Sequence, residues 1–133
     1  MVIDDDQLDF QSLKRTFERS GIRNPLLLEG NGVDAMRWLQ QTANQSATEL
    51  PRVIFLDLNM PRMSGIEFLS NLRANEHLRP ILVFVLTTSS NDEDVASAFQ
   101  YHVAGYFQKP VDSERFSQLV QTIKNYIDIC EFY

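Results

Sequence analysis

The sequence predicts an α/β protein built around a parallel β-sheet. Short apolar runs alternate with segments whose apolar residues recur every three or four positions, a pattern typical of strand–helix–strand units. The chain has 133 residues, of which 44% are hydrophobic and 23% are charged, so it can bury the core of one ordinary domain. We therefore expect residues 1–133 to form a single domain.

The first half of the chain predicts two strands and two helices in alternation. Residues 1–3 and 25–28 are short apolar runs, which we interpret as strands. Residues 8–17 and 33–39 carry apolar side chains at helical spacing, which predicts an amphipathic helix after each strand. Residues 40–49 are rich in Gln, Thr, Asn and Ser, so we expect a surface loop there.

The second half of the chain repeats this alternation with longer apolar runs. Strands are expected at residues 53–56, 81–86 and 105–107, and helices around residues 66–72, 92–99 and 116–127. The whole chain is thus predicted to contain five strand–helix pairs.

Charge and hydropathy exclude several classes of function. A net charge of −6 opposes direct binding to nucleic acid or to anionic lipid. The apolar runs are much shorter than the ~20 residues of a membrane-spanning helix, and the amino terminus does not resemble a secretory leader. The single cysteine, Cys130, cannot form an internal disulfide. We expect a cytoplasmic protein with no nucleic-acid or membrane partner.

Polar side chains follow four of the predicted strands. Asp4 and Asp5 follow the first strand, Asp57 the third, Thr87 the fourth and Lys109 the fifth. Taken singly, each could merely cap a helix. The carboxyl ends of parallel strands share one edge of the sheet, however, so we expect the three carboxylates to converge there.

Converging carboxylates need a nearby cation, because like charges at close range destabilise one another. Lys109 and a divalent metal ion would supply it. Oxygen ligands favour Mg²⁺ or Mn²⁺, and Mg²⁺ sites are commonly completed by water and phosphate oxygens. The sequence contains no Cys/His pair at the spacing of zinc ligands. We therefore expect a phosphoryl group to bind at this site.

Three segments make the sequence resemble the receiver domain of two-component response regulators over essentially its whole length. They are residues 53–61 followed by Ser64-Gly65, residues 85–89, and residues 105–110. The connection before residue 53 and the tail at 126–133 are similar to stand-alone receivers associated with bacteriophytochrome sensor kinases. The resemblance implies a doubly wound, flavodoxin-like fold with five helices and the strand order 2-1-3-4-5.

The resemblance also implies a role in a phosphorelay. Asp57 would accept a phosphoryl group from a phosphohistidine on a sensor histidine kinase or a histidine phosphotransfer protein. Asp5, Asp57 and the main-chain carbonyl of Asn59 would bind Mg²⁺ or Mn²⁺, with Asp4 acting mostly through a coordinated water. Lys109, before a cis bond to Pro110, would pair with a phosphoryl oxygen.

Signal output is likewise an implication of the resemblance. Thr87 would bind the phosphoryl group, and Tyr106 would follow by turning inward, changing the surface formed by residues 92–99, 105–107 and 116–127. With no output domain expected after the last helix, that surface would act through a partner or a homodimer, since residues 126–133 are unusually apolar. Thr88 departs from the small residue usual in the family, and we expect it to narrow access to the site.

Three alternatives stay open. The protein could be a phosphate sink or shuttle within a relay, whose receiver catalyses only its own phosphorylation and dephosphorylation. It could be a Mg²⁺-dependent hydrolase with an aspartyl nucleophile, but such enzymes usually carry a second Asp where this chain has Asn59. It could also be an adaptor that keeps the fold without the chemistry.

Overall fold

A five-stranded parallel sheet forms the centre of the computed structural model, which describes residues 1–110 and 112–130. The strands are ordered β2-β1-β3-β4-β5, as expected. Their bounds are β1 (Val2–Ile3), β2 (Leu28–Glu29), β3 (Val53–Leu56), β4 (Leu82–Thr87) and β5 (Gly105–Gln108). All four strand pairs are parallel, so the carboxyl ends of the strands share one edge.

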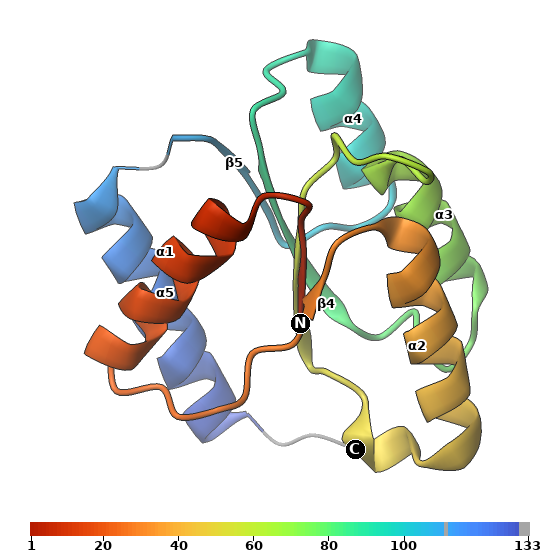
Figure 1. Cartoon of the computed structure of the whole chain (residues 1–133), viewed down its shortest axis with the longest axis horizontal. Coiled ribbons are helices and arrows are strands. Elements are labelled where there is room, and N and C mark those ends of the chain that lie inside the picture. Colours follow the sequence, from red (N-terminus) through yellow and green to blue (C-terminus); the bar gives the residue numbers. More distant parts are fainter. Residues whose placement is uncertain (111, 131–133) are drawn as a thin grey trace.

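Five α-helices cover the two faces of the sheet in the described part of the chain (Figure 1). They are α1 (Gln7–Arg19), α2 (Gly32–Gln45), α3 (Gly65–Ala74), α4 (Asp92–Gln100) and α5 (Ser113–Ile129). Helices α1 and α5 lie side by side on one face, and α2, α3 and α4 follow one another on the other (Figure 1). This is the doubly wound α/β architecture that the sequence predicts.

The central strands are apolar on both sides because helices cover both. Ile54 and Val83 pack into the core under α2 and α3, whereas Phe55 and Leu86 pack into the core under α1 and α5. Each helix begins after a side chain that accepts a hydrogen bond from a main-chain amide of its first turn. These capping residues are Asp6, Asn31, Ser64, Asn91 and Asp112.

The expected loop at residues 40–49 is wrong in its first half. Helix α2 continues to Gln45, and a short 3₁₀ helix, η1 (Ala47–Glu49), follows it. The polar residues that suggested a loop lie mostly on the exposed face of α2, while Leu39 and Thr42 keep the other face buried. The expected strand at residues 25–28 is also misplaced, because β2 shares only Leu28 with it and its two residues pair with the two-residue β1.

No helix of residues 1–110 and 112–130 has the length and apolar character needed to cross a bilayer. Helix α5 extends beyond the expected residues 116–127 at both ends. Of the apolar tail at 126–133, residues 131–133 lie outside the described part of the chain.

Candidate functional site

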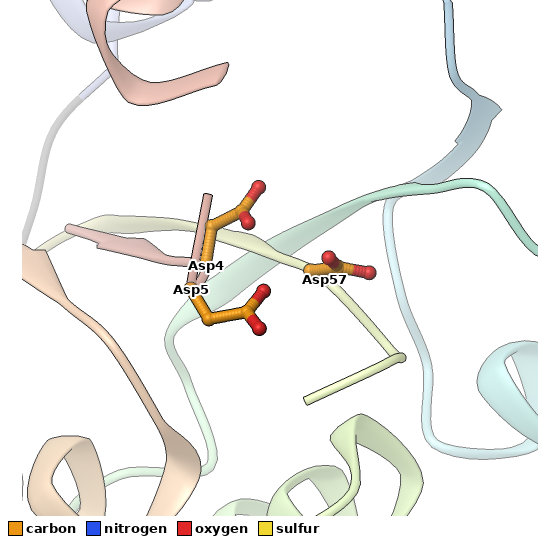
Figure 2. A group of neighbouring side chains, drawn as sticks. All are labelled: Asp4, Asp5 and Asp57. Carbon is orange, nitrogen blue, oxygen red and sulfur yellow. The ribbon is translucent and has the colours of Figure 1, made fainter. Parts of the chain in front are cut away.

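Asp4, Asp5 and Asp57 converge at the carboxyl edge of the sheet, as the sequence predicts. One carboxylate oxygen from each lies within 4.8 Å of those of the other two (Figure 2). Neighbouring strands bring the three residues together, because β1 pairs with β3 and the Asp57 amide donates to the Ile3 carbonyl at 2.9 Å. Asp4 and Asp57 are buried, whereas Asp5 is exposed at the mouth of the site.

Local hydrogen bonds orient two of these carboxylates. The main-chain amide of Asp6 donates to Asp4 Oδ1 at 2.9 Å, and that of Asn59 donates to Asp57 Oδ1 at 3.0 Å. Burial raises the pKa of the Asp4 carboxyl above its usual value, although hydrogen bonds from Lys109 and from the Asp6 amide oppose that rise. The buried carboxyl therefore depends on these hydrogen bonds to offset the cost of burying its charge.

The loop after β3 needs a glycine at position 65. A Cβ on Gly65 would lie 2.5 Å from Leu58 Cα and 2.8 Å from the carbonyl oxygen of Asp57. The Gly65 amide also donates to the Leu58 carbonyl at 3.0 Å. Only a residue without a side chain allows α3 to begin this close to Asp57, which gives the Ser64-Gly65 motif a physical cause.

Lys109 supplies the positive charge at the site. Its Nζ lies 2.6 Å from Asp4 Oδ2, 2.6 Å from Asp9 Oδ2 and 3.5 Å from Asp57 Oδ2. Burial alone would lower the pKa of Lys109, but the hydrogen bonds to Asp4 and Asp9 outweigh it and hold that pKa above its usual value. The Lys109–Pro110 bond is cis, as expected.

The donor set fits a hard divalent cation. Asp4, Asp5 and Asp57 offer only oxygen atoms, the ligands that Mg²⁺ and Mn²⁺ prefer. Three carboxylates, those of Asp4, Asp9 and Asp57, lie within 3.5 Å of the Lys109 ammonium, and Asp5 adds a fourth acidic group to the cluster, so acidic groups outnumber the one ammonium. The main-chain carbonyl of Asn59 as a further ligand stays a prediction.

Asn59 and the end of β4 meet on the other side of Asp57. The Asn59 side-chain amide donates to Thr88 Oγ1 at 3.2 Å and to Thr87 Oγ1 at 3.5 Å. Thr87 is completely buried, and its hydroxyl also accepts the Ser89 amide at 3.3 Å. Thr88 thus helps to hold the loop after β3 against the loop after β4.

Tyr106 is connected to this same loop. Its hydroxyl donates to the Ser89 carbonyl at 2.9 Å, and Ser89 Oγ donates to Asp94 Oδ2 at 2.6 Å in the first turn of α4. A continuous series of contacts therefore leads from the acidic site through β4 to α4 and β5.

Sequence reasoning found every residue of this group except Asp9 and Asp94. Asp9 was missed because it does not follow a strand directly. It stands in the first turn of α1, five positions after Asp4, and its carboxylate reaches Lys109. The signal that could have identified Asp9 is an acidic residue in the first turn of a helix that begins at the carboxyl edge of the sheet.

Comparison with known proteins decides the family. The family model for the response regulator receiver domain matches residues 1–121. The chain belongs to this family. Receiver domains are signalling modules of two-component systems, so the resemblance inferred from the three motifs is confirmed.

Related receivers match nearly the whole chain. Response regulator Rcp1 of Synechocystis sp. is 32% identical over 126 residues, covering 95% of this chain and 86% of Rcp1. The probable methanogenesis regulatory protein FilR2 of Methanothrix harundinacea is 34% identical over 126 residues, covering 95% of this chain and 81% of FilR2.

Two solved receiver structures agree with the fold. The Mn²⁺-bound form of Rcp1 has a TM-score of 0.80 at 30% identity, covering 98% of this chain and 94% of that one. The phosphorylated cyanobacterial phytochrome response regulator RcpA has a TM-score of 0.81 at 26% identity, with the same coverage of both chains.

Proposed function

We propose that this receiver accepts a phosphoryl group on Asp57 from a phosphohistidine of a sensor histidine kinase or a histidine phosphotransfer protein. The observation that carries the proposal is the cluster of Asp4, Asp5 and Asp57, with the Lys109 ammonium 3.5 Å from Asp57. The Mn²⁺-bound and phosphorylated states of related receivers support it.

The transfer would exchange one phosphorus bond for another. A carboxylate oxygen of Asp57 attacks phosphorus, the phosphorus–nitrogen bond breaks, and its electron pair returns to the donor imidazole. Later attack by water cleaves the new acyl phosphate, which restores the carboxylate and releases inorganic phosphate. The chain's own contribution is position and charge, which dominate phosphoryl transfer.

Asp4, Asp5 and Asp57 are the residues that would hold Mg²⁺ or Mn²⁺, with the Asn59 carbonyl as a further ligand. The ion, when bound, neutralises charge on the phosphoryl oxygens. Lys109 would pair with one of those oxygens as a point charge. The Thr87 hydroxyl would donate to another, since it accepts the Asn59 side-chain amide while the Asn59 main-chain amide donates to Asp57.

Thr87 and Tyr106 would carry the signal outward. Movement of Thr87 toward a phosphoryl group would pull on the Ser89 amide that it accepts. The same Ser89 holds the Tyr106 hydroxyl and the Asp94 carboxylate, so the surface of α4, β5 and α5 would respond. A local charge change would thus bias a larger element.

Intact-mass measurement after incubation with Mg²⁺ and acetyl phosphate tests the proposal. We expect a single phosphoryl adduct in the unaltered chain, none in Asp57→Asn, and none when EDTA replaces Mg²⁺. Asp112→Asn is the matched control, because it removes one exposed charge while asparagine still caps α5. Steady phosphate release over many turnovers would favour the hydrolase alternative, and no adduct with any donor would favour the adaptor.

A homodimer through α4, β5 and α5 is a separate part of the proposal. Phe99 on α4 and Tyr126 and Ile129 on α5 leave 49%, 43% and 81% of their surface exposed. Sedimentation velocity over a range of concentrations, with and without the phosphodonor, tests it. A chain that sediments as a monomer under all these conditions would exclude the dimer.

A further inference from the structure

Three carboxylates compete for the Lys109 ammonium, and they are not equivalent. Asp4 and Asp9 each hold it at 2.6 Å, while Asp57 lies at 3.5 Å. The Asp4 and Asp57 side chains are 6% and 10% exposed, whereas that of Asp9 is 39% exposed. Of these three, Asp9 alone can be rehydrated at little cost when the ammonium leaves it.

Hydrogen bonds hold the main chain on both sides of the Asp9–Lys109 pair. The Asp6 carboxylate caps α1 and accepts the Asp9 amide at 3.4 Å and the Leu8 amide at 2.9 Å. On the other side, the Lys109 amide donates to the Thr87 carbonyl at 2.7 Å. The pair therefore joins the first turn of α1 to the end of β5 between two fixed main-chain segments.

We propose that Asp9 is a positioning residue that holds the Lys109 ammonium back from Asp57. Shared between Asp9 and Asp4, the ammonium leaves the Asp57 carboxylate open to the metal ion. Without Asp9, the nearest remaining carboxylates are Asp4 and Asp57, so Lys109 would move into contact with Asp57 and compete with the cation.

The same arrangement prepares Lys109 for exchange, a step that rests on the proposed function. A phosphoryl group on Asp57 would bring new anionic oxygens toward the ammonium. Lys109 would then give up Asp9, the exposed partner, and keep Asp4, the buried one. The first turn of α1 would be released from β5 at that moment.

A double-mutant cycle on thermal unfolding in EDTA tests the pair itself, without metal or phosphoryl chemistry. Asp9→Asn should cost about 3–5 °C more in midpoint temperature when Lys109 is present than in a Lys109→Gln background. Asp6→Asn is the control, because it removes a charge from the same turn and keeps a capping residue. An Asp9 effect that is equal in both backgrounds would overturn the pairing.

Mn²⁺ titration of the same variants tests the positioning role. A contact that only stabilises the fold would not make the effect of Asp9 on Mn²⁺ affinity depend on Lys109. Asp9→Asn should weaken Mn²⁺ binding by roughly three- to tenfold when Lys109 is present. In the Lys109→Gln background, Asp9→Asn should weaken Mn²⁺ binding no more than Asp6→Asn does. Equal losses in both backgrounds would mean that Asp9 acts only through its own charge, which overturns the proposal.

The two readouts separate this inference from the proposed function. If the unaltered chain binds no Mn²⁺, the metal-dependent function fails, together with the role assigned to Asp9 in keeping Asp57 open. The thermal cycle would still decide whether the Asp9–Lys109 pair exists. If Mn²⁺ binds normally and neither cycle shows coupling, only the assignment of Asp9 fails.

Discussion

The hydroxyl of Tyr106 donates a 2.9 Å hydrogen bond to the main-chain carbonyl of Ser89, which joins β5 to the loop between β4 and α4. Tyr106 is half-buried and packs against the hydrophobic core that contains Ile54 and Val83. The contact links the two segments through which a change at Thr87 would reach the surface.

Tyr106→Phe should therefore separate phosphorylation from response. We expect a loss of about 0.5–1.5 kcal/mol in the free energy of unfolding, the usual net value of one hydrogen bond. Formation of the phosphoryl adduct should be unchanged. The chemical-shift changes that the phosphodonor causes in the amide NMR signals of residues 88–94 should become smaller. Full-sized changes in the variant would show that the hydroxyl does not couple these segments.

Gly65→Ala should damage the site through the main chain. The added Cβ would lie 2.5 Å from Leu58 Cα, and relief of that overlap must move the start of α3 or the end of β3. We expect a loss of about 1–3 kcal/mol in unfolding free energy, as is typical of overpacking, with slower adduct formation at Asp57. Gly30→Ala is the control, because nothing lies within 4 Å of a Cβ there.

Arg73 should contribute much more to stability than an exposed arginine. Its guanidinium donates to the carbonyls of Tyr101, Arg79, Ile81 and His102 at 2.6–3.1 Å. Arg73→Gln leaves most of these acceptors without a donor, so we expect a loss of about 2–4 kcal/mol by urea unfolding. Arg37→Gln, which breaks one exposed ion pair with Asp34, should change stability by less than about 0.5 kcal/mol.

The raised pKa of Asp4 predicts a definite dependence of stability on pH in EDTA. Because the folded-state pKa lies above the unfolded value of 3.8, the stabilising contribution is full below that value and is lost as pH rises through the folded-state pKa. Asp4→Asn lacks this loss, so its stability relative to the unaltered chain should improve between pH 3 and pH 7. Excess Mg²⁺ should reverse the trend by favouring the carboxylate. A difference that does not change with pH in EDTA would contradict the assignment.

Most of the fold was predictable because each central strand is an unbroken apolar run. Residues 53–56 coincide with β3, and the expected 81–86 is shifted by one residue from β4. The second helix was predicted too short because its last turns contain Gln, Thr and Asn, residues that also occur in loops. Their helical conformation depends on burial of the opposite face, including Thr42, which a local pattern does not reveal.

The candidate site was predictable to the extent that its residues follow strands. Strand pairing brings Asp4, Asp5 and Asp57 together, and that consequence of topology can be anticipated from sequence. Asp9 could not be found in this way, since its contact with Lys109 depends on the direction in which α1 leaves β1. The unequal sharing of the ammonium among three carboxylates likewise requires coordinates.

The ion pair between Lys109 and Asp4 joins positions that are 105 residues apart. A growing polypeptide that has not yet reached Lys109 already carries Asp4, Asp9 and Asp57 but lacks the ammonium that pairs with them in the folded chain. The charge balance of the site can therefore form only after the residue that follows β5 has been synthesised.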